Sequence, residues 1–178
     1  MEDIKDRLGD KKYYFLKKLQ DYIGEELIFF GSIKRCDFFE ENSDIDIAII
    51  TDNTNSTIKK LQGYLNIGDD KMRKIVQKIP NSDRIIYGYK TNYENESQQL
   101  SIEIILYDEK YRNDILEHIN RINNFPYYIT YPLIFLKLLF YKLNIISSDI
   151  LKYFKVLLIN TYLQQPLKDN LIPFNFKP

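Results

Sequence analysis

Two short stretches decide the fold: Phe29–Arg35, which reads FFGSIKR, and Ser43–Ile47, which reads SDIDI. The apolar residues before Gly31 predict a short buried strand, and glycine lets the backbone turn sharply and a ligand come close. Ser32 then offers a hydroxyl and a backbone N–H, which would suit a phosphate oxygen if a helix begins here. Taken alone, the Gly-Ser pair also fits an ordinary turn at the end of a strand.

The second stretch continues to Ile50 and alternates between isoleucines and other residues, which predicts a strand. Asp44 and Asp46 share one face of this strand, and two carboxylates so close together repel each other. A divalent cation would relieve the repulsion, because Mg²⁺ binds one or two carboxylates together with substrate phosphates. Two such ions roughly 3.5–4 Å apart can support an in-line displacement at phosphorus. The simpler alternative is a strand face that is open to solvent.

Three more charged residues could belong to the same site. Glu103 lies among apolar residues in LSIEIIL (residues 100–106), and an acid in such a strand needs a partner. That partner is either a metal shared with the two aspartates or a Lys or Arg across a predicted hairpin, with Arg84 as the candidate. Lys34 and Arg35 stand close enough to the Gly-Ser pair to add positive charge there, or they are simply solvated.

In the rest of the chain, the spacing of apolar residues and the positions of glycine and proline predict a mixture of helices and strands. Predicted helices cover residues 10–23, 58–65, 72–79, 108–122, 131–143 and 148–164, and predicted strands cover 27–30, 43–50, 84–90 and 99–107. Asp108 is the expected N-cap of its helix, and Pro132 is expected near the start of another. The last two predicted strands, with a polar loop over 91–97, predict a β-hairpin. The tail from Pro166 onward is expected to be irregular.

This pattern resembles the nucleotidyltransferase fold of the DNA polymerase beta superfamily. Members share an apolar strand, a Gly-Ser pair, a spacer, an Asp-x-Asp strand and a third acid in a later strand. Gly31-Ser32 and Ser43–Ile47 match, and the resemblance covers roughly residues 11–107. The sequence departs from the family in a long spacer and in a glutamate where aspartate is more frequent. The resemblance implies an α/β (α+β) fold, with a mixed β-sheet flanked by helices and a C-terminal helical section.

The resemblance also implies a role for each residue of the motif. The catalytic and metal-binding carboxylates would be Asp44, Asp46 and Glu103, and the last would activate the acceptor hydroxyl. The nucleotide- and phosphate-binding residues would be Gly31, Ser32, Lys34 and Arg35. Two Mg²⁺ or Mn²⁺ ions and a nucleoside triphosphate would be the cofactors and the substrate.

The implied activity is transfer of a nucleoside monophosphate from NTP to an acceptor hydroxyl, with release of pyrophosphate. Polynucleotide 3′ ends, small molecules, nucleotides and proteins all stay open as acceptors. Two alternatives to this enzyme also stay open. One is a catalytically weak nucleotide-binding or regulatory subunit, and the other is an antitoxin-like enzyme that nucleotidylates a partner protein.

Composition limits the class of protein. The 178 residues fit a nucleotidyltransferase-like domain, 1–125, with a helical section, 126–178, packed on it. The single cysteine excludes an intrachain disulfide and favours a reducing compartment. The N-terminus carries no apolar leader and no long apolar run follows, so we expect a cytoplasmic protein without membrane contact. The abundance of Ile, Asn, Lys and Tyr is typical of an AT-rich genome, such as that of a large virus.

Charge is balanced overall but divided along the chain. The 25 basic and 25 acidic residues argue against a uniformly basic nucleic-acid binder. From residue 126 onward there are 6 basic and 2 acidic residues, so this section could face a phosphate-rich substrate. The lysines of its predicted helices are Lys137, Lys142, Lys152 and Lys155, and most are expected to be ordinary surface charges. Cys36 and His118 are expected to be an incidental thiol and a structural side chain.

Overall fold

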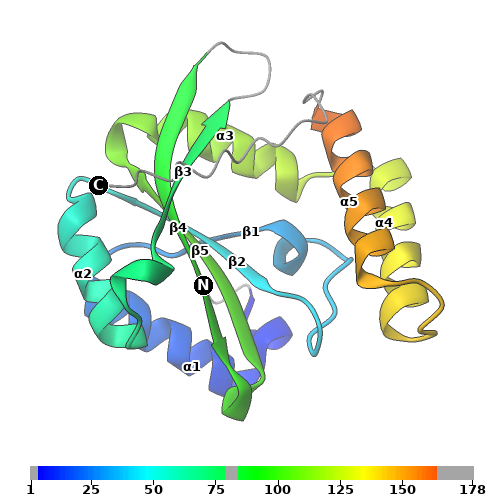
Figure 1. Cartoon of the computed structure of the whole chain (residues 1–178), viewed down its shortest axis with the longest axis horizontal. Helices are drawn as coiled ribbons and strands as arrows, with labels where there is room; N and C mark the ends of the chain where they lie inside the picture. The colour runs from blue at the N-terminus through cyan, green and yellow to red at the C-terminus, as the bar shows by residue number, and fades with distance from the viewer. Residues whose placement is uncertain (1–3, 79–83, 164–178) are drawn as a thin grey trace.

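Five strands form one mixed sheet in the order β1-β2-β5-β4-β3 in the computed structural model, which describes residues 4–78 and 84–163 (Figure 1). The strands are β1 (Ile28–Phe30), β2 (Ile45–Thr51), β3 (Arg73–Lys78), β4 (Ile85–Asn95) and β5 (Leu100–Asp108). β2 and β5 run parallel, and every other neighbouring pair is antiparallel. The mixed sheet predicted from the sequence is therefore confirmed.

Five α-helices surround the sheet. They are α1 (Lys5–Ile23), α2 (Thr54–Leu65), α3 (Arg112–Asn123), α4 (Tyr127–Tyr141) and α5 (Ser148–Leu163). Short 3₁₀ turns link some elements: η2 (Gly31–Lys34), η3 (Asp69–Lys71), η4 (Glu96–Gln98) and η5 (Glu109–Tyr111). The side chain of Asp108 accepts a hydrogen bond from the Lys110 backbone N–H, so it caps η5, the turn that leads into α3.

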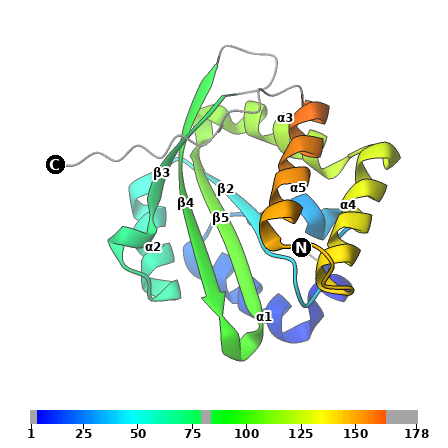
Figure 2. The same cartoon turned by 45° about the vertical axis from the view of Figure 1, so that its right-hand side comes forward.

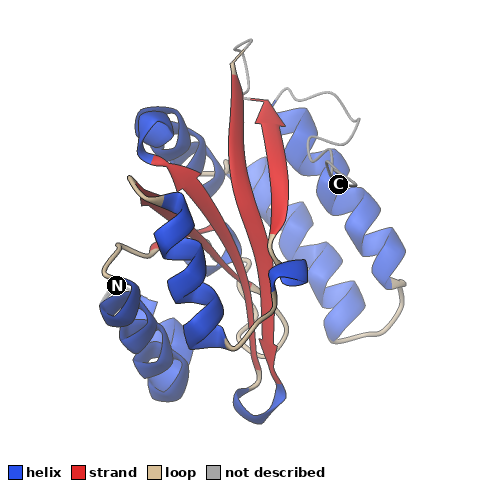
Figure 3. Cartoon of the chain, turned by 60° about the vertical axis from the view of Figure 1, so that its left-hand side comes forward, coloured by secondary structure: helices blue, strands red, loops and turns tan. Residues whose placement is uncertain are grey.

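Alternation along β2 places its side chains in two different cores. Ile45, Ile47 and Ile49 pack with α1 and α2 on one face of the sheet, where all three are 2% exposed or less. Ala48 and Ile50 pack with α3 on the opposite face. Helices therefore lie on both sides of the sheet (Figure 3). Because the period of a strand is two, Asp46 shares the α3 face with Ala48.

The last two helices lie side by side at one side of the sheet (Figures 1 and 2). Their apolar contacts form a small separate core from Phe125, Ile129, Leu133 and Leu163. Each such side chain stabilises the pair by about 1.5–3 kcal/mol when it is fully removed from water. This pair stands on the same side of the sheet as α3, which leads into α4.

One predicted helix is wrong. Residues 72–79 were expected to be helical, but the structure forms β3 over Arg73–Lys78, paired antiparallel with β4. Ile75 is the buried residue of this edge strand, and Ile79 and Pro80 lie outside the described residues. Apolar residues spaced three and four apart in such a short window do not exclude a strand, and pairing with β4 decides the outcome.

Two predicted boundaries also differ, and a third prediction is not tested. β4 continues through residues 91–95, which were expected to be a loop, because these residues pair with β5. α4 begins at Tyr127 after Pro126 as N-cap, so Pro132 lies in its second turn rather than near its start. The predicted tail from residue 166 lies outside the described residues. In the described parts of the chain, no helix is long and apolar enough to cross a membrane.

Candidate functional site

The backbone of Gly31 lies directly against the carboxylate of Asp46. β1 pairs with β2 so that Phe30 is opposite Asp46, and Gly31 then turns with a φ of 75°. A Cβ atom at Gly31 would stand only 2.1 Å from Asp46 Oδ2. Only glycine combines this left-handed conformation with so close an approach. The turn therefore fixes the position of the Asp46 carboxylate at the end of β1.

Asp46 and Glu103 are neighbours on the parallel strands β2 and β5. They are directly paired in the register, and both side chains point to the α3 face of the sheet. Burial and then the negative charge of Glu103 raise the pKa of Asp46 from 3.8 to about 7. This value includes smaller contributions from Lys155 and Arg35, which lower the pKa, and from Asp44, which raises it. Two of the three predicted carboxylates are therefore close enough to repel each other.

Glu103 has a cationic partner across the β4–β5 hairpin. Lys90 Nζ lies 2.6 Å from Glu103 Oε2. The sequence allowed such a pair but named Arg84, which instead forms an ion pair with Asp114. The described residues contain no group of three or more His, Cys, Asp or Glu side chains arranged to hold a metal ion. Asp44, Asp46 and Glu103 are thus not drawn into one cluster, and their shared metal stays a prediction.

Asp44 lies just before β2 and is exposed. It borders a pocket of about 400 Å³ whose lining contains five acidic residues and no Lys or Arg. The lining residues are Glu40, Glu41, Asn42, Ser43, Asp44, Glu94, Asn95, Glu96, Gln99, Leu100 and Ser101. The negative charge of Asp44, after burial, raises the pKa of Tyr141 on α4. Asp44 therefore stands between the sheet and the helical pair.

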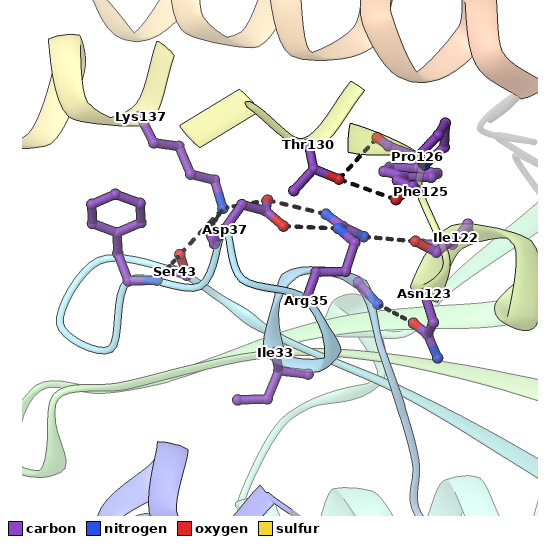
Figure 4. Close-up of polar contacts among 12 residues, drawn as sticks. Ile33, Arg35, Asp37, Ser43, Ile122, Asn123, Phe125, Pro126, Thr130 and Lys137 are labelled. Carbon is purple, nitrogen blue, oxygen red and sulfur yellow. Dashed lines mark hydrogen bonds and ion pairs between the residues drawn. The ribbon is translucent and has the colours of Figure 1, made fainter. Parts of the chain in front are cut away.

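Behind the Gly-Ser turn, Arg35 is buried in a network that ties this segment to α3 and α4 (Figure 4). Its Nε and Nη2 donate to the two carboxylate oxygens of Asp37 at 2.8 and 3.1 Å. Its Nη1 donates to the Ile122 carbonyl, and the guanidinium lies 4.5 Å from the centre of the Phe125 ring. These contacts orient Arg35 within the fold, and its role as a phosphate ligand stays a prediction.

Lys137 joins the same network from α4. Its Nζ donates to the Asp37 carbonyl at 2.6 Å and lies 3.1 Å from the Asp37 carboxylate. Burial alone would raise the pKa of Asp37, but hydrogen bonds and charge from Arg35 and Lys137 hold it below its ordinary value. The sequence left Lys137 open between a surface charge and a residue facing phosphate, and the structure instead buries its side chain, which is only 5% exposed.

The other predicted phosphate ligands lie in the η2 turn. Ser32 is 8% exposed and Lys34 is half-buried. The backbone N–H of Gly31 donates to Asn123 Oδ1 at 3.0 Å, so α3 holds the turn from the other side. No local sequence pattern indicates this contact, because Gly31 and Asn123 lie far apart along the chain.

Lys155 is the residue of the helical pair that acts on the site electrostatically. It is exposed on α5, and its charge is among the causes that lower the pKa of Asp46. The sequence left Lys155 open between a surface charge and a ligand for phosphates. Its influence on Asp46 shows that its charge lies near the site, and its role as a phosphate ligand stays a prediction.

The residues present fit a divalent cation with few protein ligands. Paired carboxylates on neighbouring strands supply the oxygen ligands that Mg²⁺ prefers, and substrate phosphates commonly complete its coordination. Burial, and after it the negative charge of Glu103, raises the pKa of Asp46, and a cation beside the two carboxylates would stabilise the charged form. Asp46 and Glu103 would hold the ion, with Asp44 nearby.

A mixed sheet with paired carboxylates beside a Gly-Ser turn defines a protein of the nucleotidyltransferase class. The model of the nucleotidyltransferase domain family matches residues 12–128, and the chain belongs to this family. No curated protein matches the sequence. Among solved structures, the chain is similar to one from the "structure of GLD-2/RNP-8 complex", with 16% identity and a TM-score of 0.40. The similarity covers 97% of this chain and 63% of that one.

Proposed function

We propose that this chain is a metal-dependent nucleotidyltransferase that transfers a nucleoside monophosphate from NTP to an acceptor hydroxyl and releases pyrophosphate. The observation that carries the proposal is the placement of Asp46, beside Glu103 and against the Gly31 turn. This placement supports a triphosphate bound beside the turn and the two carboxylates. Membership of the nucleotidyltransferase domain family supports the reaction class.

The proposal gives the residues separate tasks. Gly31 and Ser32 hold the terminal phosphates of the NTP, and Arg35 and Lys155 add positive charge near them. Asp46, Glu103 and Asp44 position divalent ions. A bound Mg²⁺ or Mn²⁺ would supply charge neutralisation at the reacting phosphate. Glu103, whose Oε2 lies 2.6 Å from Lys90 Nζ, accepts the proton of the attacking hydroxyl.

A labelled-NTP transfer screen tests this proposal. The purified chain is incubated with Mg²⁺ or Mn²⁺ and each of four acceptor classes: RNA, DNA, nucleotides and proteins. Asp46→Asn should abolish transfer, whereas Asp52→Asn should retain it. Asp52 is a matched control, because it is an exposed acid just after the other end of β2. Full transfer by the Asp46→Asn variant would show that the proposal is wrong.

The Lys90–Glu103 ion pair favours a second candidate, a nucleotide-binding regulatory subunit. A glutamate that is already paired with a lysine is less available to a metal ion. In that case calorimetry should detect NTP binding that does not depend on Mg²⁺, and no acceptor should be labelled. A labelled protein acceptor would instead support the antitoxin-like enzyme, and mass spectrometry would identify the modified side chain.

A further inference from the structure

A second pocket, of about 670 Å³, opens at the sheet edge where β3 begins. Its lining comes from the end of α2, the start of β3 and the middle of β4: Leu65, Asn66, Ile67, Lys71, Arg73, Lys74, Ile75, Lys90, Thr91, Asn92, Tyr93 and Glu94. Four of these residues are cationic and one is acidic. Its volume lies in the range of pockets that bind small molecules. We propose that this pocket binds the phosphate groups of a nucleotide, either free or within a nucleic-acid strand.

Three of the four cations of this basic pocket have no anionic partner among the described residues, whereas the fourth, Lys90, pairs with Glu103. Across residues 4–78 and 84–163, the side chains of Lys71, Arg73 and Lys74 make no hydrogen bond or ion pair. Arg73 lies directly opposite Lys90 in the β3–β4 register, so two like charges face each other on one side of the sheet. Such a pair is unfavourable until an anion lies between its members. A phosphate group would supply that anion.

The backbone beside the basic pocket also has unused hydrogen-bonding groups. Pairing between β3 and β4 begins at Arg73 and Lys90, but β4 continues to Asn95 in its pairing with β5. No described strand pairs with residues 91–95 on the other side. Alternate backbone N–H groups along this edge therefore face outward and can donate to a ligand.

One buried polar side chain of the lining is also without a partner. Thr91 is 1% exposed, and its hydroxyl oxygen has no hydrogen-bond partner within the described chain. Buried hydroxyl groups normally have a hydrogen-bond partner, so an unpaired one indicates a place where a ligand or a water molecule can bind. A bound ligand, or water held with it, would meet this need.

Lys90 connects the basic pocket with the candidate active site. It lines the pocket and forms the 2.6 Å ion pair with Glu103. Arg73, Lys90 and Glu103 lie on the same face of the sheet, which follows from the register of β3, β4 and β5. A phosphate bound here would therefore compete with Glu103 for Lys90. Binding itself does not depend on the transfer reaction proposed above.

Fluorescence anisotropy with a short labelled single-stranded RNA tests the proposal, with EDTA present to suppress metal-dependent NTP binding. The double variant Arg73→Glu/Lys74→Glu should weaken RNA binding about tenfold or more, and should lower the steepness of its salt dependence. Lys17→Glu/Lys18→Glu is the matched control, since it reverses two adjacent exposed charges on α1 outside the pocket. This control should change the affinity less than about twofold.

The arms of the experiment separate the ligand sources. If unlabelled ATP displaces the RNA and loses its own binding in the pocket variant, the pocket accepts free nucleotides. If ATP does not displace the RNA, the pocket requires phosphates within a strand. Equal losses in both double variants, no binding of either RNA or ATP by the unmodified chain in EDTA, or equal binding of a poly-glutamate peptide would overturn the proposal.

Two controls keep a negative result interpretable. Circular dichroism and thermal unfolding check that the charge-reversed protein folds, and Arg73→Gln/Lys74→Gln removes the charges without reversing them. This neutral variant should also lose RNA affinity, and unchanged affinity would contradict the proposal. Asp46→Asn should keep RNA binding while losing transfer. Failure of the transferase proposal can therefore be distinguished from failure of this one.

Discussion

At the scale of single residues, the closest contact in the candidate site is between a glycine and a carboxylate. Gly31→Ala would place a methyl group 2.1 Å from Asp46 Oδ2 and force an L-residue into a φ of 75°. The conformation alone costs about 1–2 kcal/mol, and the contact adds to it. We expect loss of transfer activity and a lower free energy of unfolding, measured by urea denaturation.

Gly63→Ala is the matched control for that substitution. A Cβ at Gly63 would find its nearest neighbour, the Tyr22 hydroxyl, at 3.6 Å, which is ordinary contact. Gly63 lies inside α2, where alanine is favoured over glycine by about 1 kcal/mol. The control should therefore be neutral or stabilising. An equal effect of both alanines would contradict the assigned role of Gly31.

Asp46 should make the stability of the metal-free protein depend on pH. Its folded-state pKa of about 7 lies above 3.8, so the unfolded chain releases this proton first as pH rises. The folded state therefore loses stability between about pH 4 and 7, by at most about 4 kcal/mol. In EDTA, Asp46→Asn should be more stable than the unmodified protein at pH 8 and should show no advantage below pH 4.

Urea denaturation across this pH range measures the difference, with Asp52→Asn as the exposed-acid control just after β2. A lower stability of Asp46→Asn at pH 8 would refute the inferred charge repulsion.

The sequence identified Asp46 because strand periodicity and a motif are both local. It could not identify Lys90 or Asn123 as partners, because register and helix placement bring them there.

At the scale of elements, the buried network around Asp37 attaches the η2 turn to α4. Asp37 is 1% exposed and pairs with both Arg35 and Lys137. Asp37→Asn would leave two buried cations without their anion. Removing one partner of a buried ion pair typically costs about 3–5 kcal/mol, and urea denaturation should show a loss of about this size in the free energy of unfolding. Asp114→Asn is the control, because its pair with the exposed Arg84 side chain should contribute at most about 1 kcal/mol.

A loss smaller than that of the control would show that the network does not hold the two elements together.

Nothing in the sequence around Asp37 indicates its burial, since Lys34, Arg35 and Asp37 resemble a solvated turn. The same lack of a local sequence signal explains why β3 was predicted to be a helix. Its apolar residues fit a helix as well as a strand, and only pairing with β4 distinguishes them. Elements with strict alternation, such as β2 and β5, were predictable.

At the scale of the whole molecule, the structure shows where the basic residues of the C-terminal section lie relative to the candidate site. The basic C-terminal section contributes Lys155, whose charge reaches the Asp46 carboxylate across the space between α5 and the sheet. Lys137, by contrast, is held in the buried ion pair with Asp37. A surplus of positive charge in a section of sequence therefore predicts an electrostatic role, but the fold decides which lysine performs it.

If Lys155 contacts the triphosphate, it should contribute to NTP binding more than its neighbours on α5 do. Lys155→Met should raise the Kd for NTP with Mg²⁺ about tenfold in titration calorimetry, which corresponds to about 1.4 kcal/mol. Lys152→Met is the control, because Lys152 is equally exposed on the same helix but is not among the charges that shift Asp46. Raising the ionic strength should reduce the difference between the two variants, since salt screens exposed charges. Equal Kd values would place Lys155 with the ordinary surface lysines, and the triphosphate would then depend on the η2 turn and the metal-binding carboxylates alone.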